Sequence, residues 1–541
     1  MRHQKLHFLA SACLLTLTSG ALASNVTEFP DNGSEQLARG GAWLARASDP
    51  LATLYNPAGL AGQDTRLLLN ANLSMQRTCF TRMKAVNDTT EDGVASGASY
   101  PEVCNKGGPF PNPQLAFTYR VSDRLGLGLA VAGPSAVGNT TWPEFAPDAS
   151  GANQASPQRY LLTKADVLFL TPTIGAGYQV TDTLRVGASF HWGLATLQFS
   201  TVADATNQNG SKPADNDIKA SLSGKDLFVP GVTLGTIWSP TSSLDVAGSF
   251  KWSAPIDASV DAATYVNYFR PAVAANGLDS AVKFGYTKDA DCAFGVSAGV
   301  CGPGKGNVVV PVPMEAKLGL RYHQPVVGAD PTRRDPMSQD KWDIEADFTF
   351  ANNKTFDSLQ VRFPADAQGN GVIPVNGTGG GTLPPIADVP HMYKNVFGVR
   401  VGGDYNVLPD QLAIRAGVFG ETDGQEAAYQ NIDFMGGARL GIAGGATYRL
   451  KLGNGERKRA LDLSLGFMHM FVAEQSYMPT DPNAPGVKAL GGVACNPGSN
   501  GNVPGDLCSD GKQKYRTNWN ANLGTITSSL NVLNVGVTYR F

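Results

Sequence analysis

The sequence predicts an all-β fold: an antiparallel transmembrane β-barrel of about 14 strands, plugged by a small N-terminal helical hatch. Three observations support this prediction. From residue 66 onward apolar residues alternate with polar or small ones, short and long connections alternate, and the chain ends in an alternating strand that finishes at Phe541. Alternation with period two is typical of strands with one apolar face. An even strand number is usual for a closed single-chain barrel of this type.

The first 23 residues are expected to form a secretory signal peptide. They contain a basic start, an apolar run over 8–17 and the small-residue site Ala21-Leu22-Ala23. After them, no apolar run approaches the length of a transmembrane helix. The chain is therefore either soluble after export or a membrane barrel, and a charged fraction of 16% with 62 glycines favours the barrel. A formal net charge of -3 gives no reason to expect a nucleic-acid partner.

Residues 24–64 are predicted to form the hatch, because they carry two helix-start signals ahead of the first strand. Asp49 and Asn56 each come directly before a proline, which suits a capping residue followed by a first helical position. The alternative is two ordinary proline turns. Asn56 is expected to anchor the hatch to the wall near the third strand. The predicted hatch and gating residues are Asp49, Asn56, Pro57 and Ala58.

The barrel itself is expected to occupy residues 65–541. The predicted strands lie at about 66–76, 115–121, 125–131, 160–180, 183–200, 218–238, 243–262, 308–323, 341–363, 392–407, 411–421, 434–451, 459–476 and 528–541. Long connections alternate with short ones, which predicts an outer-membrane location with both termini in the periplasm and the long loops outside. The terminal aromatic residue is what such barrels present to the barrel-assembly machinery.

Six cysteines remain outside the signal peptide, and all fall in long connections as three local pairs. An even number of cysteines in an exported chain predicts disulfides that staple loops, although the sequence does not fix the pairing. Metal binding is the weaker alternative, because no histidine accompanies any pair at ligand spacing. The candidate pairs are Cys79 with Cys104, Cys292 with Cys301 and Cys495 with Cys508.

The face of the early strands that should point inward carries apolar side chains. A pocket with small and apolar walls suits a hydrophobic ligand. The same side chains could instead pack against the hatch, and both interpretations can hold. The inward apolar residues are Val167, Phe169, Leu197, Phe199, Leu227 and Val229.

The inward face of the later strands is charged instead. Glu315, Lys317 and Arg321 lie on one predicted strand, and Asp343 and Glu345 lie on the next. This pattern predicts a salt-bridge network that stiffens the wall and holds the hatch. The alternative is that one cation binds an anionic head group through a charge-assisted hydrogen bond.

Groups suited to catalysis are sparse, so no enzyme, catalytic residue, cofactor or metal is expected. Beyond the signal peptide the histidines are scattered, and none neighbours a serine and an acid in a recognisable arrangement. A hydrolase with histidine and serine on adjacent strands is the alternative. The histidines are His191, His323, His391 and His469.

Over almost the whole mature chain, the sequence resembles the FadL-type outer-membrane transporters, which include long-chain fatty acid importers and TodX-like proteins for aromatic hydrocarbons. The most specific match is Tyr55-Asn56-Pro57-Ala58-Gly59, preceded by Asp49. Thr171 stands where the family has an asparagine, and Gly177 displaces the spacing before Tyr178. Further matches are Arg159-Tyr160 and 171–178, Val310-Pro311, 342–363 and 412–418.

The resemblance implies capture of hydrophobic cargo at outer loops, binding in the lumen, hatch rearrangement and lateral release through a gap at a kinked third strand. Here that strand ends at Gly133-Pro134, and a proline cannot donate a ladder hydrogen bond. The Arg-Tyr pair and inward parity suggest Arg159 as the head-group contact, with Lys317 and Arg321 behind it.

Passive uptake of long-chain fatty acids or similar molecules is therefore expected. The expected partners are this hydrophobic ligand, outer-membrane lipids and the assembly machinery, and the expected state is a monomer. The alternatives are a surface adhesin or receptor with disulfide-stapled loops, an importer of aromatic hydrocarbons, and a general porin.

Overall fold

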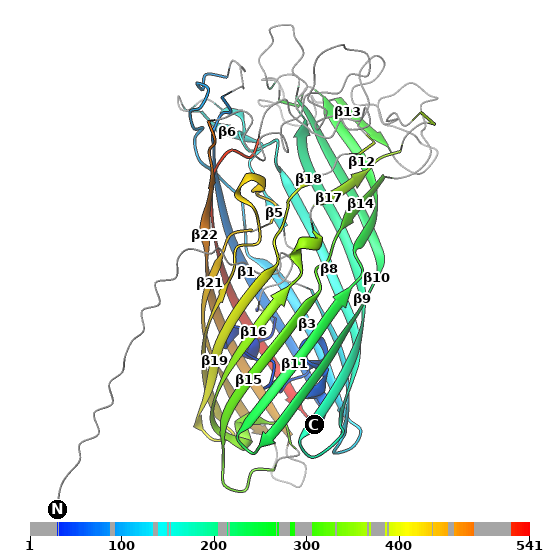
Figure 1. Cartoon of the computed structure of the whole chain (residues 1–541), viewed down its shortest axis with the longest axis vertical. Coiled ribbons are helices and arrows are strands. Elements are labelled where there is room, and N and C mark those ends of the chain that lie inside the picture. Colours follow the sequence, from blue (N-terminus) through cyan, green and yellow to red (C-terminus); the bar gives the residue numbers. More distant parts are fainter. Residues whose placement is uncertain are drawn as a thin grey trace, which may run out of the picture.

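A computed structural model gives the fold (Figure 1). It describes residues 30, 32–86, 92–133, 139–148, 151, 153–203, 214, 217–266, 268–269, 282–286, 306–330, 333–356, 358–364, 367–368, 385–386, 389–434, 436–452, 459–480 and 521–541. The predicted signal peptide, Pro134 and the cysteines at 292, 301, 495 and 508 lie outside these residues.

Fourteen antiparallel strands form a closed barrel, as predicted. Neighbours in sequence pair around the ring, and the last strand closes on the first, from Arg66 opposite Arg540 to Arg82 opposite Gly524. The strands are β1 (Arg66–Arg82), β3 (Phe110–Arg120), β4 (Leu125–Ala132), β8 (Lys164–Gln179), β9 (Leu184–Ala203), β10 (Ile218–Thr241), β11 (Leu244–Ser253), β15 (Glu315–Pro325), β16 (Asp340–Ala351), β19 (Val396–Leu408), β20 (Leu412–Glu421), β21 (Arg439–Leu452), β22 (Arg459–Tyr477) and β23 (Gly524–Arg540).

Short strands extend one side of the wall beyond this ring. β10 pairs with β11 over its second half and with β12 over residues 219–225. β12 pairs in turn with β14, and β14 with β17, so the barrel is taller here. The short strands are β2 (Val103–Cys104), β5 (Asn139–Thr141), β6 (Phe145–Pro147), β7 (Asn153–Ala155), β12 (Ile256–Val266), β13 (Val282–Tyr286), β14 (Gly306–Val310), β17 (Ser358–Arg362) and β18 (Val389–Pro390).

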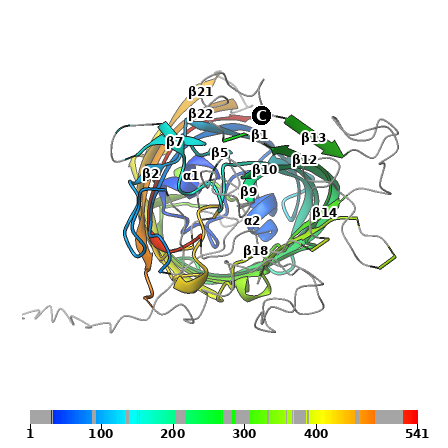
Figure 2. The same ribbon diagram turned by 90° about the horizontal axis from the view of Figure 1, so that it is seen from above.

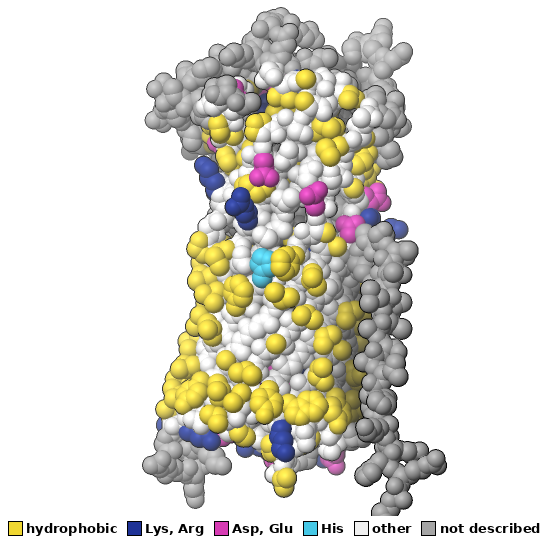
Figure 3. Space-filling view, turned by 90° about the vertical axis from the view of Figure 1, so that its left-hand side faces the viewer, with side chains coloured by type: hydrophobic (Ala, Val, Ile, Leu, Met, Phe, Trp, Pro, Cys, Tyr) yellow, Lys and Arg dark blue, Asp and Glu magenta, His cyan; other side chains and the backbone are white. Residues whose placement is uncertain are grey.

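The two faces of the wall differ as the period-two pattern requires. On β22, Leu465 and Phe467 point outward and are about half exposed, at 54% and 47%, whereas Asp462 and Met468 point inward and are buried. Apolar side chains cover the outer wall between charged side chains at the two ends (Figure 3). This distribution is that of a wall facing lipid.

The hatch lies inside the barrel (Figure 2). The name is used from here on for residues 32–64. It contains α1 (Ser34–Ala38), α2 (Ala52–Tyr55) and the 3-10 turn η1 (Pro57–Leu60). Wall glycines allow this close approach: a Cβ atom at Gly417 would lie 2.0 Å from the Arg39 carbonyl carbon. The hatch lies toward the end of the barrel with short connections, here called the turn end; the opposite end is the loop end (Figure 1).

Helices elsewhere in the described chain are short. They are α4 (Pro336–Gln339), η4 (Asn353–Thr355) and η5 (Ala427–Tyr429). None of the described helices has the length and apolar character needed to cross a membrane.

The predicted strands were wrong in two respects. First, three of them were drawn too long: the range 243–262 comprises β11 and part of β12, the range 308–323 comprises parts of β14 and β15, and the strand expected at 341–363 ends at Ala351, because η4 and a turn separate it from β17. Second, Leu227 does not point inward, because a β-bulge between Asp226 and Val229 in β10 adds a residue there. The bulge shifts the alternation by one, so Leu227 is 55% exposed and Val229 is buried.

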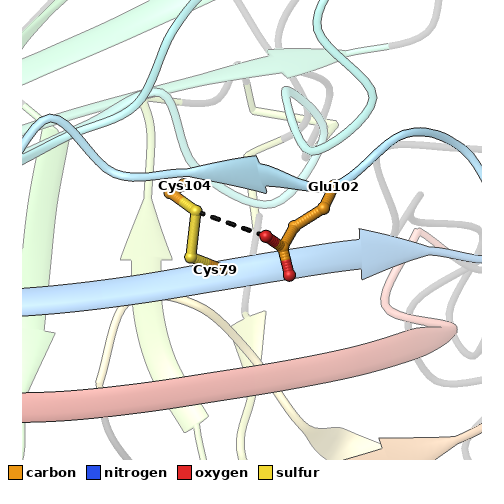
Figure 4. Close-up of side chains that lie close together, drawn as sticks. All are labelled: Cys79, Glu102 and Cys104. Carbon is orange, nitrogen blue, oxygen red and sulfur yellow. Dashed lines mark hydrogen bonds between the residues drawn. A yellow bond between two sulfur atoms is a disulfide. The ribbon is translucent and has the colours of Figure 1, made fainter. Parts of the chain in front are cut away.

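The predicted cysteine pair at the start of the first long connection is a disulfide between Cys79 and Cys104 (Figure 4). It joins β1 to β2, which pairs with β1 at this point. The Glu102 carboxylate lies 3.7 Å from the Cys104 sulfur. Because both sulfurs are bonded to each other, this group has no free thiolate to offer a metal ion.

Candidate functional site

An apolar cavity lies in the lumen on the loop side of the hatch. Its free volume is small, about 30 Å³, so a ligand must displace lining side chains to enter it. Four of its lining residues lie on β8 and β9 and were predicted to point inward from the alternation along these strands. The lining residues are Val167, Phe169, Leu197, Phe199, Ile256, Val310, Val312 and Phe434. No charged or hydrogen-bonding side chain is among them, so this upper cavity can select a ligand only by shape and by hydrophobic burial.

A second cavity, of about 50 Å³, lies between the upper cavity and the hatch. Phe169 and Val312 line both cavities, so the two are adjacent. Tyr55 and Leu54 of the hatch form part of the lower cavity's floor, and Lys251 and Glu315 provide its charged lining. An elongated ligand could therefore bury its apolar part above and place a polar end beside the hatch.

The charges beside the lower cavity come from neighbouring strands. Lys251 on β11 is directly opposite Glu315 on β15 in the ladder. Lys317 donates to the Glu315 carboxylate at 2.9 Å, and its Nζ lies 5.7 Å from the centre of the Tyr55 ring. Two lysines and one glutamate thus lie beside the lower cavity.

Arg321, predicted as a second head-group contact, lies farther toward the turn end in a network of acids. It pairs with Asp245 at 3.0 Å and with Asp343 at 2.8 Å. It does not line either lumen cavity among the described residues. Lys317 is therefore the predicted cation that the fold brings closest to the lower cavity.

Arg159, predicted as the first head-group contact, lies in an aromatic cluster at the loop end. Its Nε donates to the Asp217 carboxylate at 2.8 Å, and its guanidinium stacks 4.2 Å from the centre of the Tyr160 ring. Burial opposes its charge, but Tyr160 and Asp217 outweigh that effect and raise the pKa of Arg159 above its ordinary value. The charge of this arginine is thus already matched within the protein.

Beside the lower cavity, the described part of the wall pairs with β8 in two separate stretches. β8 pairs with β4 over residues 171–178 and with β5 over 164–166. Between these stretches, no ladder partner for 167–170 is found on that side among the described residues. Gly133, which follows β4, lines the lower cavity here, and its carbonyl accepts from Asn32 of the hatch and from Asn112, both at 3.1 Å.

Asn56 anchors the hatch to the wall, but not near the third strand as predicted. Its Nδ2 donates to the Thr236 carbonyl on β10 at 3.3 Å and to the Leu44 carbonyl at 2.9 Å. Its Oδ1 accepts from Ala58 N at 3.2 Å and so caps η1. A Cβ atom at Gly235 would lie 2.0 Å from that oxygen, so glycine is required at this point of the wall.

A buried ion network joins the hatch to the later strands. Arg39 contacts Asp343 and Asp404 at 2.5 Å each and Glu345 at 3.1 Å. Arg46 contacts Asp343 at 2.7 Å and Asp404 at 2.9 Å. The acids were predicted to hold the hatch, but their hatch partners were not identified from the sequence. Since all five side chains are buried, loss of either partner would leave a costly unpaired charge.

Backbone groups of the hatch add to this attachment. Trp43 N and Leu44 N both donate to the Asp347 carboxylate, at 2.9 and 3.1 Å. Ala45 N donates to Glu345 at 2.6 Å. The hatch is therefore fixed mainly to β16, through the alternate inward-facing acids of that strand.

Asp49 is an acid of the hatch itself, and it lies in an environment that shifts its pKa. Its Oδ1 accepts from Leu51 N at 2.7 Å, and burial together with the nearby Glu35 raises its pKa to about 7. Burial also acts on Glu35, but Arg415 and Arg46 outweigh it and lower the pKa of Glu35 to about 2. Asp49 therefore titrates near neutral pH, whereas Glu35 stays ionised.

Hatch stability should consequently fall between pH 5 and pH 8. The folded pKa of Asp49 lies above its ordinary 3.8, so its contribution is fully present below about pH 4 and is lost as the pH rises through 7. We expect larger ion leakage through the barrel at pH 8 than at pH 5, and no such difference in Asp49→Asn. Conductance in planar bilayers measures this, and an identical pH response in wild type and variant would contradict it.

The histidines show no catalytic arrangement in the described part of the chain. None is hydrogen-bonded to a serine hydroxyl there. His191 lies between the hydroxyls of Thr173 and Thr233, at 2.9 and 2.6 Å. The others contact an aspartate or an asparagine: His323 with Asp340, His391 with Asp433 and His469 with Asn531.

The sequence and the architecture both match those of known proteins. Residues 14–492 match the family model described as outer membrane protein transport protein (OMPP1/FadL/TodX). The chain belongs to this family. Members of the FadL/TodX family are outer-membrane transporters of hydrophobic compounds, and they act as channels rather than as enzymes. None of the curated proteins matches the sequence significantly.

Solved structures share the fold at low sequence identity. A FadL homologue of Pseudomonas aeruginosa aligns with 96% of this chain and 100% of its own, at 16% identity and a TM-score of 0.60. The toluene transporter TodX of Pseudomonas putida aligns with 95% of this chain and 99% of its own, at 13% identity and a TM-score of 0.54. The toluene transporter TbuX of Ralstonia pickettii gives 96% and 99%, 15% identity and a TM-score of 0.51.

Several lining residues were missed in the sequence. Lys251 follows Asp245, Ala247 and Ser249 on the inward face of β11, so strand parity could have identified it. Phe434 was placed at the start of the predicted strand 434–451, but β21 begins at Arg439, so Phe434 lies in a connection, where strand periodicity assigns no direction.

Proposed function

We propose that this protein imports long-chain fatty acids, or amphipathic molecules of similar shape, passively across the outer membrane. The observation that carries the proposal is the pair of adjacent cavities: an entirely apolar one above and one with two lysines nearby below. An alkyl chain gains about 0.8 kcal/mol for each CH₂ group that it buries. The upper cavity supplies that burial.

The head group of the cargo should lie beside Lys251 and Lys317 rather than at Arg159. A carboxylate placed there would lie beside two lysines and one glutamate. At Arg159 it would compete with Asp217, which is already bonded to that guanidinium. A charge-assisted hydrogen bond at the lower cavity is therefore the more favourable contact.

Release should occur sideways through the wall beside Gly133, between the two paired stretches of β8. This glycine and Phe169 both line the lower cavity, and residues 167–170 of β8 are unpaired there with the described part of the wall. Asn32 of the hatch bonds to the Gly133 carbonyl, so movement of the hatch would loosen this edge. An apolar molecule that reaches the gap partitions into the lipid without further energy input.

The loop end should face the outside and both termini the periplasm. The Cys79–Cys104 disulfide supports this orientation, because it lies in a long connection at the loop end and disulfides persist in oxidising surroundings. Cargo would then meet the aromatic cluster around Tyr160 before it reaches the lumen.

Lys251→Met should weaken binding of oleate by about tenfold to a hundredfold, because a hydrogen bond to a charged group contributes about 1.5–3 kcal/mol. Binding of oleyl alcohol, which lacks the charge, should change little. Titration calorimetry of the purified protein measures both ligands. Arg159→Met is the matched control and should leave the ratio of the two affinities near that of wild type. Equal loss for oleate and oleyl alcohol would contradict the placement of the head group.

Import of aromatic hydrocarbons is the second candidate. Phe169, Phe199 and Phe434 line the upper cavity, and aromatic faces pack well against an aromatic cargo. Solved relatives that share the fold include toluene transporters. Toluene uptake without oleate uptake would favour this candidate and would exclude the fatty acid proposal.

A further inference from the structure

One lining residue of the upper cavity, Phe434, does not belong to the strands of the wall. Phe434 lies in the connection between β20 and β21, and it is partly buried against the apolar cluster around the cavity. Its ring lies 5.9 Å from that of Phe356 and 6.0 Å from that of His391, measured between centroids. These partners belong to segments next to β17 and β18, at the loop end of the lumen (Figure 1).

Specific hydrogen bonds hold Phe434 in this position. The preceding residue, Asp433, accepts from Phe434 N through Oδ1 at 2.8 Å. The other oxygen of Asp433 lies 2.8 Å from His391 Nε2. His391 Nδ1 lies 2.9 Å from the Val389 carbonyl, and the histidine is fully buried. Both ring nitrogens therefore face oxygen atoms, so the orientation of the imidazole ring is fixed from both sides.

A second set of contacts joins the same two segments. Tyr393 forms an isolated β-bridge with Gln425, whose Nε2 donates to the His391 carbonyl at 3.4 Å. The rings of His391 and Tyr393 are stacked with centroids 5.2 Å apart. The connection that carries Phe434 is thus fastened to the segment 389–393, and through Gln430 and Asn522 also to residues 522–524.

The two kinds of attachment determine which lining side chains of the cavity can move. Phe169 and Leu197 are on β8 and β9, which are paired along most of their length, so moving them would break ladder bonds. Moving Phe434 requires only rotation of one side chain or loss of the contacts of Asp433 with His391.

We propose that Phe434 is the gate between the loop end and the upper cavity and limits the width of the cargo admitted, with His391 and Asp433 as its positioning residues. The inference rests on the proposed function, since it assumes that hydrophobic cargo occupies the upper cavity. It adds a residue that selects cargo by width, independent of the lysines that would select its head group.

Uptake of palmitate and of a pyrene-labelled fatty acid of equal chain length tests this inference. Phe434→Ala should raise the ratio of pyrene-label uptake to palmitate uptake by about tenfold, because pocket size discriminates bulky groups by such factors. Phe434→Leu, which keeps an apolar side chain, should give a smaller rise and serves if the alanine variant fails to fold. Phe467→Ala, on the outer face, is the matched control and should leave the ratio unchanged.

His391→Phe keeps the aromatic packing but removes both polar contacts, and should shift the uptake ratio in the direction of Phe434→Ala. Melting temperatures in detergent identify variants that are merely unstable, since loss of folding lowers uptake of both ligands together. If both Phe434 variants and His391→Phe take up palmitate and show the wild-type ratio of pyrene-label to palmitate uptake, the proposed gate is wrong while the proposed function still stands. Absence of palmitate uptake and binding in the wild type would overturn the proposed function and the gate with it.

Discussion

Replacing Arg39 by methionine should detach the hatch from β16 and increase ion leakage through the barrel. Arg39 contacts Asp343, Glu345 and Asp404 in a fully buried setting. Removing one partner of a buried ion pair costs about 3–5 kcal/mol, because a charge remains without its counter-ion. Arg46 still pairs with two of these acids, so the hatch should loosen rather than the barrel unfold. Single-channel conductance in planar bilayers measures the leak.

Arg124→Met is the control for this prediction. Arg124 pairs with Asp182 at 3.1 Å, and the two side chains are 52% and 90% exposed. An exposed pair contributes less than about 1 kcal/mol, so this variant should conduct like the wild type. A closed channel in Arg39→Met would show that the network does not hold the hatch.

Leu197→Asp should abolish cargo binding. Leu197 is 3% exposed and lines the upper cavity. A carboxylate there must either be ionised in an apolar cavity or take up a proton, and each outcome costs several kcal/mol. We expect oleate affinity to fall by at least about a hundredfold, which corresponds to about 2.7 kcal/mol. Calorimetric titration of the purified barrel measures this affinity.

Leu197→Met is the matched control, since it preserves volume and apolar character and should bind oleate nearly as well as the wild type. Folding of both variants can be checked by their melting in detergent. Oleate binding by Leu197→Asp with wild-type affinity would place the cargo elsewhere.

The barrel and half of the upper cavity could be predicted because both follow from strand alternation. Parity alone identified Val167, Phe169, Leu197 and Phe199, since alternate residues of one strand must share a face. The same argument failed at Leu227. The bulge in β10 arises from the pairing of two strands, so the sequence of β10 alone does not reveal it. A single added residue reverses every inward assignment up to the next irregularity.

The charged residues were harder to assign, because a sequence gives their signs but not their partners. Acids on β16 were expected to hold the hatch, and they do, but Arg39 and Arg46 lie about 300 residues away in the chain. For the same reason Arg159 could not be distinguished from a head-group ligand until its contact with Asp217 was seen.

Residues near the strand ends were assigned wrongly. Phe434 and Val312 fell inside predicted strands, but both reach the cavity from segments without regular structure, where the direction of a side chain depends on tertiary contacts. The hatch was placed inside the barrel on sequence grounds. Its anchor through Asn56 nevertheless lies on β10, because β8, β9 and β10 are the strands that η1 contacts most.

The measurement that tests the central claim most directly is uptake by cells whose only route for long-chain fatty acids is this protein. We predict that labelled oleate enters cells that produce the wild type, that Leu197→Asp abolishes this uptake, and that a small sugar enters at the background rate in both. Sugar uptake without oleate uptake would contradict the account, since it would describe an open porin rather than a hatched barrel with an apolar binding cavity.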